Sequence, residues 1–198
     1  MKLPASYYLN PDVEFLASDL LGKVLFTRTE VGVTAGIIVE TEAYFGTGDK
    51  ASHAYGGRRT ARTETLYSEG GTAYTYLCYG IHHLFNVVTS VKDDPKCVLI
   101  RSIEPLEGLD IMEMRRKMPA DRKAISSGPG SAAKSLGIDL TFNKSLLTGN
   151  RIWIEDRGLS YGTSKIGTAS RIGIAYAQEH ADLPLRFFIA NSKYIKAK

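Results

Sequence analysis

Two glutamates, Glu40 and Glu42, stand two residues apart in the stretch IIVETEAYFG. If this stretch is a β-strand, their side chains point to one face of it, and those of Thr41 and Ala43 point to the other. One interpretation is that the strand simply reaches solvent at its end. The other is catalytic: one carboxylate holds a structural partner while the second activates a water molecule as a general base.

Arg101 bears on this choice because it follows four apolar residues in CVLIRSIEP. An arginine that is buried without an anion is costly, so we expect Arg101 to have a carboxylate partner. Glu40 and Glu42 are both candidates for that partner. The sequence leaves open whether such a pair is catalytic or an ordinary structural ion pair.

Aromatic residues crowd the stretch TAYTYLCYGIHHLFNVV, which has the pattern of two short strands joined by a turn. With a period of two, Tyr74, Tyr76 and Cys78 share one face, whereas Tyr79 adjoins Gly80 at the expected turn and projects from the tip. Aromatic residues on strands are commonly part of a core. An aromatic residue at an exposed tip is instead suited to enter a base stack and fill the gap left by an extruded nucleotide.

Three histidines, His53, His82 and His83, add to the two glutamates enough ligand types for a zinc ion. However, adjacent histidines are not a usual chelating spacing, and the sequence contains no H-E-x-x-H or comparable motif. We therefore expect neither a metal nor another cofactor.

A basic loop, GGRRTART, carries Arg58, Arg59 and Arg62 among glycines and threonines with free backbone donors. This composition suits contact with phosphate groups, although a solvated basic loop is a common alternative. A later Gly-Pro-Gly, before a short predicted helix, offers further backbone amides to a phosphate. That second signal is weak by itself.

The elements that must position these residues are predicted from capping and periodicity. A helix is expected from Asn10, as its N-cap with Pro11 at the first helical position, to Gly22. Two strands follow on either side of residues 30–32. A long polar loop over residues 47–71 is expected to run over the surface, and loops of this length are usually functional or disordered.

Further along the chain, a buried strand around Arg101 precedes a helix in LEGLDIMEMRRKM and a short helix after Gly-Pro-Gly. The segments RIWIEDRG, SRIGIAYA and PLRFFIA are predicted to be short strands that close the sheet. No repeat, linker or low-complexity tract divides the chain. Residues 1–198 are therefore expected to form one mixed α/β (α+β) domain.

Composition sets only broad limits on function. The net charge of +4 favours polyanionic partners, but weakly. Neither Cys78 nor Cys97 has Cys or His at ligand spacing, so buried free thiols are expected. The N-terminus lacks the apolar core of a signal peptide, and no stretch approaches the ~20 apolar residues of a membrane span. These features predict a reduced, cytoplasmic protein.

Taken in order along nearly the whole chain, LLGKVLF, IVETEAYFG, SHAYGGRRTART, GTAYTYLCYGIHHLFNVV, VLIRSIEPLEG, SSGPG, RIGI and PLRFFI resemble the motifs of the alkyladenine (3-methyladenine, methylpurine) DNA glycosylases. The ordered set is far more specific than any single motif. The resemblance implies a curved, largely antiparallel sheet with surrounding helices and a β-hairpin that protrudes into the DNA minor groove. It also implies a monomeric, monofunctional hydrolase that excises damaged purines from double-stranded DNA.

By this resemblance, Glu42 corresponds to the general base that deprotonates the water attacking the sugar C1′. Arg101 corresponds to the residue that helps to hold this water, and Glu40 is then structural. At the tip of the hairpin, Tyr79 corresponds to the intercalating wedge, with Ile81 beside it.

The resemblance also implies a pocket for the extruded base. Tyr44 and Tyr76 correspond to residues that stack on its faces, and His53 to a residue that hydrogen-bonds its edge. Asn86 corresponds to an asparagine that crowds the 2-amino group of guanine. Contacts with the DNA backbone are expected from Arg58, Arg59 and Thr60.

These residue types suit the implied chemistry. A purine alkylated at N3 or N7 is positively charged, and aromatic rings attract it by a cation–π interaction of up to ~2 kcal/mol when desolvated. Such a base is already a good leaving group, whereas hypoxanthine or ethenoadenine needs protonation, and the sequence offers no unambiguous acid. No lysine or terminal amine matches a nucleophile position, so a Schiff-base lyase step is not expected.

Two departures from the family pattern concern DNA contacts. Ser131 and Ala132 follow Gly-Pro-Gly where the family commonly has Lys-Leu, with Lys134 further on. His82 and His83 stand beside the wedge, at positions that the family fills with apolar or aromatic groups. A function of another class is also open: a protein that flips and shields damaged bases without cleaving them has no need of a buried acid.

Overall fold

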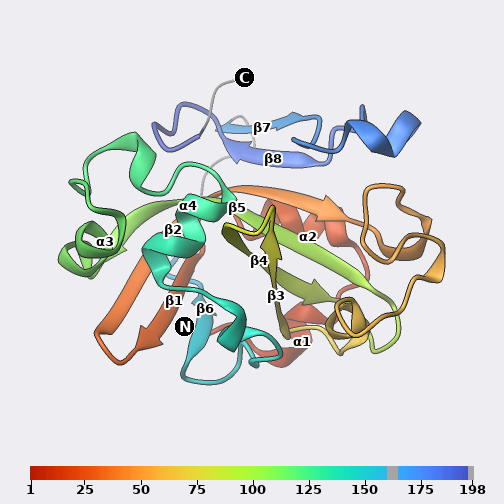
Figure 1. Cartoon of the computed structure of the whole chain (residues 1–198), viewed down its shortest axis with the longest axis horizontal. Coiled ribbons are helices and arrows are strands. Elements are labelled where there is room, and N and C mark those ends of the chain that lie inside the picture. The colour runs from red at the N-terminus through yellow and green to blue at the C-terminus, as the bar shows by residue number, and fades with distance from the viewer. Residues whose placement is uncertain (160–164, 196–198) are drawn as a thin grey trace.

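Strand β2 (Gly32–Tyr44) is the element to which most of the sheet is attached (Figure 1). Its first half pairs with β1 (Val24–Thr29) and its second half with β8 (Arg186–Ile189). Along nearly its whole length it also pairs with β5 (Lys96–Glu107). All of these pairings are antiparallel. The computed structural model describes residues 1–159 and 165–195.

The described residues form an eight-stranded sheet in the order β3-β4-β5-β2-β1-β6, with β7 joined to β8. Its other strands are β3 (Ala73–Cys78), β4 (His82–Thr89), β6 (Ile152–Glu155) and β7 (Ile166–Ala169). The helices are α1 (Ala5–Tyr8), α2 (Val13–Asp19), α3 (Leu109–Arg116) and α4 (Pro129–Leu136). The sheet is curved and antiparallel, so the predicted single α+β domain is confirmed.

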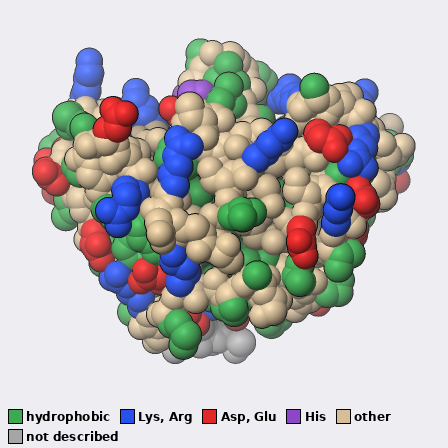
Figure 2. Space-filling model, turned by 90° about the horizontal axis from the view of Figure 1, so that it is seen from below, with side chains coloured by type: hydrophobic (Ala, Val, Ile, Leu, Met, Phe, Trp, Pro, Cys, Tyr) green, Lys and Arg blue, Asp and Glu red, His purple; other side chains and the backbone are tan. Residues whose placement is uncertain are grey.

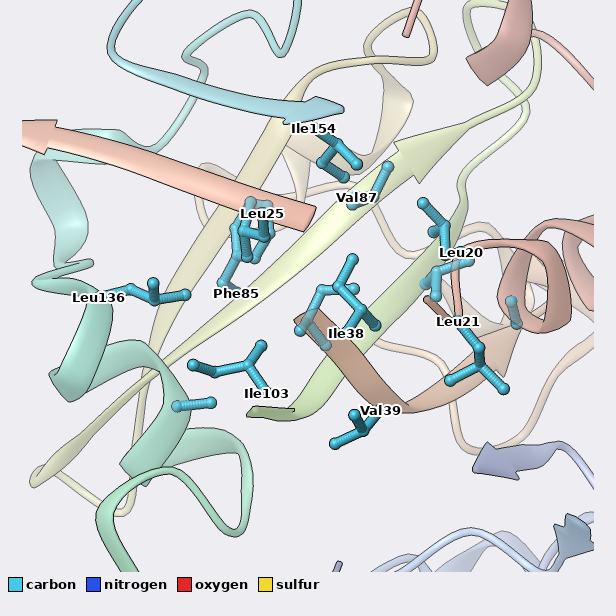
Figure 3. Close-up of a cluster of buried hydrophobic side chains, with 14 of the residues drawn as sticks. Leu20, Leu21, Leu25, Ile38, Val39, Phe85, Val87, Ile103, Leu136 and Ile154 are labelled. Carbon is cyan, nitrogen blue, oxygen red and sulfur yellow. The ribbon is translucent and has the colours of Figure 1, made fainter. Parts of the chain in front are cut away.

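The main hydrophobic core brings together side chains from the sheet and from helices α2 and α4 (Figure 3). Leu25, Ile38, Phe85 and Leu136 are among its buried members. Burying a side chain of this size contributes about 1.5–3 kcal/mol relative to leaving it exposed. Because strand side chains alternate, the neighbouring Phe26 lies outside this cluster, in a second one with Trp153. The core therefore holds β2 and β5, which carry the polar residues discussed below.

The prediction of Asn10 as a helix N-cap is wrong. Helix α2 is capped by Asp12, whose carboxylate accepts a hydrogen bond of 2.9 Å from the backbone N–H of Phe15. Asn10 instead accepts a hydrogen bond from the Asp12 N–H and forms a turn before the helix. A carboxylate at the N-cap is also favoured by the helix dipole, so the helix begins two residues later than the Asn-Pro signal suggested.

The prediction of a strand over residues 170–177 is also wrong. Strand β7 ends at Ala169, and Ala175–His180 forms 3-10 turns (η7). Gly173 has a φ of +80°, and the side chain of Arg171 is fully buried against Asp49. The positive φ interrupts an extended chain. We call residues 171–180 the strap.

The prediction that residues 47–71 run over the surface is only partly right. Residues 55–62 are exposed, but Asp49, Ala54 and Leu66 are almost completely buried. Ala54 and Leu66 belong to a small hydrophobic cluster with Tyr74 of β3. Short 3-10 helices occupy Gly46–Gly48, Tyr55–Gly57 and Glu64–Tyr67.

Strands β3 and β4 form the predicted hairpin. Cys78 pairs with His82, and the backbone N–H of Ile81 donates to the Cys78 carbonyl at 3.1 Å. Tyr79 and Gly80 have φ angles of +51° and +71°, the left-handed conformation that a type I′ turn requires at both central positions. Tyr79 therefore projects from the turn and is 87% exposed, as predicted.

The face of the molecule shown in Figure 2 carries basic side chains interspersed with acidic ones. The net charge of +4 is thus not gathered in one patch on this face, and charge alone does not indicate a binding surface. Among the described helices, none has the length and hydrophobicity needed to cross a membrane. Cys97 is buried as predicted, whereas Cys78 is partly exposed beside the hairpin turn, and both thiols are free.

Candidate active site

A cavity of about 670 Å³ opens beside the hairpin. Its walls come from β3, β4, the loop that follows β2, the N-terminus of α4 and the strap. Its size falls in the usual range for small-molecule sites and accommodates a purine base. Residues predicted for the base pocket lie in this wall: Tyr44, His53, Tyr76 and Asn86.

Glu40 and Glu42 are both completely buried, which excludes the interpretation that β2 merely reaches solvent. Arg101 is 5% exposed and lies between them. Its Nε is 3.1 Å from Glu40 Oε1, and its Nη1 is 3.0 Å from Glu42 Oε1. The predicted carboxylate partner of Arg101 is therefore confirmed, and both candidates fill that role.

Irregular pairing between β2 and β5 gives Arg101 this position. Glu40 pairs with Ser102, and the next residue, Thr41, pairs with Ile100. Arg101 is thus an extra residue on β5, a β-bulge. Bulges re-aim side chains and occur frequently next to active sites.

The surroundings of Glu40 are those of a structural carboxylate. Besides Arg101, it accepts hydrogen bonds from the Ser102 hydroxyl at 2.9 Å and from Arg186 Nη1 at 3.1 Å. Two guanidinium groups therefore compensate its charge. Neither Ser102 nor Arg186 lines the cavity.

Glu42 has different partners. It accepts hydrogen bonds from the backbone N–H of Ile172 at 2.7 Å and from the Tyr44 hydroxyl at 2.9 Å, in addition to its contact with Arg101. All three partners line the cavity, so Glu42 lies directly behind the cavity wall. Since a carboxylate offers about four acceptor sites, one on Oε2 is left for a water molecule.

Burial raises the pKa of the Glu42 carboxyl. The Arg101 charge opposes this shift, as do the hydrogen bonds from Ile172 and Tyr44, while the Glu40 charge adds to it. A carboxylate with a raised pKa is a stronger base once it is ionised. The arrangement thus makes Glu42 suited to accept a proton.

Aromatic rings form much of the cavity wall. His53 Nδ1 lies 2.9 Å from the Tyr74 hydroxyl, and its ring centroid is 4.7 Å from that of Tyr76. The Tyr74 and Tyr76 rings are 5.4 Å apart. The Arg62 guanidinium lies 5.3 Å from the centre of the Tyr76 ring, at the exposed side of this group.

Burial, together with the charges of Arg62 and Arg58, lowers the pKa of His53 to about 4. The imidazole is therefore neutral at physiological pH. A neutral ring keeps one N–H donor and does not repel a positively charged ligand.

Asn86 is buried in the cavity wall with its side chain fixed in place. Its amide group donates to the Tyr74 carbonyl at 3.2 Å. The Cys97 thiol lies 3.9 Å from its Oδ1. The amide can therefore act as a rigid obstacle at this point of the wall.

The hairpin tip has little contact with the rest of the protein. Tyr79 and Ile81 are 87% and 72% exposed. His82, in contrast, packs on the first turn of α4, where a Cβ added to Gly130 would lie 2.9 Å from the imidazole Cγ. His82 therefore braces the tip against α4, while His83 is half-buried on the neighbouring position.

The residues predicted to contact the DNA backbone differ in whether their side chains are already paired within the protein. Arg58 and Thr60 are exposed. Arg59 is exposed as well, but it pairs with Glu64 at 2.7 Å and with Asp93 at 2.8 Å, so its charge is already compensated. Contacts of these residues with phosphate stay predictions.

The departure at Ser131 brings a different cation to the first turn of α4. The Ser131 hydroxyl accepts a hydrogen bond of 3.1 Å from Arg116 of α3. The described residues include no carboxylate paired with Arg116. A positive charge therefore stands beside this helix N-terminus although the lysine is absent.

The histidines and glutamates do not gather into one cluster. His53 contacts Tyr74, whereas His82 packs on Gly130. Within residues 1–159 and 165–195, no group of three or more His, Cys, Asp or Glu side chains is arranged to hold a metal ion.

Two features of the site were not predicted from the sequence. The sequence indicates Tyr74 only as a member of the hairpin, yet Tyr74 lines the cavity and positions His53. The strap supplies the Ile172 N–H to Glu42 from 130 residues away. The motif RIGI pointed to this segment, but no local signal shows that a backbone N–H from it reaches β2.

Comparison with known proteins shows the family of this chain. The family described as Methylpurine-DNA glycosylase (MPG) matches residues 7–193, so the chain belongs to that family, and the predicted resemblance is confirmed. A protein of Chlamydia abortus named "Putative 3-methyladenine DNA glycosylase" is 50% identical over 188 residues, covering 94% of this chain and 97% of its own length. Proteins of the same name from Clostridium perfringens (strain 13 / Type A) and Bacillus licheniformis are each 44% identical, covering 100% and 98% of this chain and 100% and 95% of their own lengths.

Proposed function

We propose that this protein is a monofunctional DNA glycosylase that flips alkylated or deaminated purines out of duplex DNA and hydrolyses their N-glycosidic bond. The product is an abasic site for base excision repair. The observation that carries the proposal is the buried Glu42, paired with Arg101 behind the wall of an aromatic cavity, in a chain of this family.

In the proposed reaction, a water molecule occupies the remaining acceptor site of Glu42 beside Arg101. Glu42 takes a proton from this water as it attacks the sugar C1′, and the damaged purine leaves with the bonding electrons. General base catalysis of this kind contributes typically about 10²–10⁴-fold to a rate. Arg101 has a second task, because its charge favours the ionised form of Glu42 and opposes the rise in pKa that burial causes.

The cavity wall supports the proposed binding of a damaged purine. Tyr44 and Tyr76 offer ring faces to the extruded base, and a cationic alkylpurine gains up to ~2 kcal/mol from such a face when desolvated. The neutral His53 offers a hydrogen bond without repelling that charge. The fixed amide of Asn86 would obstruct the 2-amino group of an undamaged guanine.

The hairpin supports the proposed extrusion step. Flipping a base costs a few kcal/mol, and the cost is lower where damage has already weakened pairing. Tyr79 would fill the gap in the base stack, with Ile81 beside it. The exposed loop would contact the DNA backbone through Arg58, Arg59 and Thr60.

All of these residues come from one chain, so we propose that a monomer is sufficient for activity. The substrate would be chromosomal DNA, which in bacteria such as those of the relatives lies in the cytoplasm.

Incubation with duplex oligonucleotides tests the proposal. Each duplex contains one 3-methyladenine analogue, hypoxanthine or ethenoadenine, and alkali afterwards reveals abasic sites. We expect strand cleavage only after alkali, with undamaged duplex as the control. Cleavage without alkali would contradict a monofunctional enzyme. Binding to every lesion without an abasic product would instead favour the alternative, a protein that shields damaged bases.

A further inference from the structure

Arg171 is a buried charged residue that the proposed mechanism does not use. Its side chain is completely buried, at the start of the strap. The next residue, Ile172, donates its backbone N–H to Glu42 at 2.7 Å. Whatever fixes Arg171 therefore also fixes the direction of that N–H.

The guanidinium of Arg171 joins three segments of the chain. It forms an ion pair with Asp49, in which Nη2 lies 2.9 Å from Oδ1, and it donates to the carbonyls of Ala43 at 2.9 Å and His180 at 3.2 Å. Its Cζ also lies 4.7 Å from the ring centre of Tyr44. The end of β2, the loop after it and both ends of the strap are thereby held together.

Asp49 is itself rigidly held. Its carboxylate is completely buried and accepts hydrogen bonds from the backbone N–H groups of Phe45 at 3.3 Å and Ala51 at 2.9 Å. A buried ion pair is a poor way to gain stability, because well-packed apolar residues often do as well or better. What a buried ion pair supplies instead is a fixed geometry.

We infer that Arg171 is a positioning residue: anchored by Asp49, it holds the Ile172 N–H on the Glu42 carboxylate and supports the Tyr44 ring. The Tyr44 hydroxyl donates to Glu42 as well, so Arg171 acts through two of the three donors to this carboxylate. The inference rests on the proposed function only where Glu42 is taken as the base. The geometry around Glu42 is testable without any reaction.

Charged or titratable groups face Glu42 from several elements: Glu40 and Tyr44 from β2, Arg101 from β5 and Arg171 from the strap. A test must leave these charges in place and change only the geometry. Arg171→Lys does this, because lysine keeps the charge but its single ammonium group cannot reach all of the acceptors that the guanidinium reaches. Asp49→Glu is a second variant: it keeps the charge that pairs with Arg171 and displaces the carboxylate by one methylene group.

Arg115→Lys is a matched control. Arg115 also makes several hydrogen bonds from a partly buried position, to Thr34 at 3.1 Å, Thr29 at 2.8 Å and the Ser135 carbonyl at 2.9 Å. It belongs to α3 and contacts no residue of the site. A loss of stability in this control without other effects shows what a merely structural arginine does.

The first measurement is an NMR titration of the Glu42 carboxyl carbon and the Ile172 amide in the full-length protein. Hydrogen bonds to a carboxylate favour its charged form, so in Arg171→Lys and Asp49→Glu we expect the pKa of Glu42 to rise further, by about one unit. The Ile172 amide should cease to follow the Glu42 titration. A Glu42 titration and an Ile172 amide unchanged in both variants would overturn the inference.

The second measurement is the pH dependence of excision under single-turnover conditions. Because a base works only when ionised, a raised pKa moves the acid side of the rate profile to higher pH, by about the same one unit. The Arg115→Lys profile should coincide with that of the wild type. A rate that falls equally at all pH values in Arg171→Lys would show a structural role only. If the wild type shows no excision, the proposed function fails, while the NMR titration still decides the role of Arg171.

Discussion

The buried layer of Glu40, Arg101 and Glu42 and the exposed tip of the hairpin differ in their relation to solvent. In the buried layer the side chains are at most 6% exposed, and each charge has a partner at about 3 Å. At the tip, Tyr79 and Ile81 expose most of their apolar surface. Chemistry on a glycosidic bond needs groups that are fixed before the substrate arrives, whereas a wedge gains its burial only on binding.

Both regions place groups in environments that are costly for the free protein. The buried layer removes two carboxylates and a guanidinium from water, which is costly even when they are paired. The tip holds Tyr79 at a φ of +51°, a conformation that a non-glycine residue adopts at some cost. Removing the cation from the buried layer leaves its carboxylates uncompensated and should destabilise the fold. Replacing Tyr79 by glycine relieves the positive φ and should not.

The largest effect on stability is expected from Arg101→Leu. This change leaves Glu42 without its cation and Glu40 with Arg186 alone, so the free energy of unfolding should fall by about 3–5 kcal/mol at pH 7. Without the opposing Arg101 charge, burial raises the folded-state pKa of Glu42 further above its unfolded value, so the loss should shrink as the pH is lowered toward that unfolded value. Urea denaturation at several pH values measures both effects. Arg157→Leu, in an exposed pair with Glu107, is the control and should cost under about 1 kcal/mol; equal losses would contradict the account.

At the tip, Tyr79→Gly should separate binding from stability. Removal of the ring should weaken binding to a lesion-containing duplex by about 10–100-fold, because stacking on a base is worth about 1–3 kcal/mol. Glycine relieves the positive φ, so the free energy of unfolding should stay the same or rise slightly. Fluorescence anisotropy and urea denaturation check these two outcomes. Leu146→Ala, at another exposed apolar residue, should leave affinity unchanged, and unchanged affinity in Tyr79→Gly would count against the wedge.

His53 should make stability depend on pH in a defined window. Its folded-state pKa of about 4 lies below the ordinary value of 6.5, so the unfolded chain binds the extra proton between these pH values. The wild type should therefore lose stability as the pH falls from 6.5 toward 4, by on the order of 1 kcal/mol per unit, and His53→Gln should lack this contribution. Denaturation of both proteins at matched pH measures the difference. Parallel curves would show that His53 is not buried in the neutral form.

The smallest effects are expected in the basic loop. If the exposed Arg58 contacts one phosphate, Arg58→Ala should reduce the slope of log affinity against log salt by about 1. Arg59→Ala should change the slope less, because Glu64 and Asp93 already compensate its charge. Affinities measured over a range of salt concentrations compare the two variants. A larger change for Arg59→Ala would mean that DNA displaces its acidic partners.

The sequence predicted the hairpin, its tip and the pairing of Arg101 because each depends on local signals. The alternation of strand side chains places Tyr76 on one face of the hairpin, and Tyr79 adjoins the glycine of the turn. An arginine in an apolar strand requires an anion. The wrong predictions fall where a distant contact decides. Asp12 caps the helix in place of Asn10 because its charge is favoured by the helix dipole. Residues 170–177 turn at Gly173, and Arg171 within them pairs with Asp49, over 120 residues away.

The hydrogen bond from the strap to Glu42 shows most clearly what a sequence pattern cannot predict. A backbone N–H has no identity in a sequence, so nothing in RIGI indicates that the Ile172 amide binds a carboxylate on β2. The bulge at Arg101 is likewise a property of two strands in register. Local patterns indicated which residues matter, and the fold decided which groups meet.

The central claim is that Glu42, and not its equally buried neighbour Glu40, activates the water. Single-turnover excision and affinity, measured on one lesion duplex for Glu42→Gln and Glu40→Gln below their melting temperatures, test it most directly. Glu42→Gln should bind the lesion duplex with near wild-type affinity and slow excision by about 10²–10⁴-fold. Glu40→Gln should lose stability but keep its excision rate within about tenfold, since it removes a structural charge. Near-normal excision by Glu42→Gln would contradict the account.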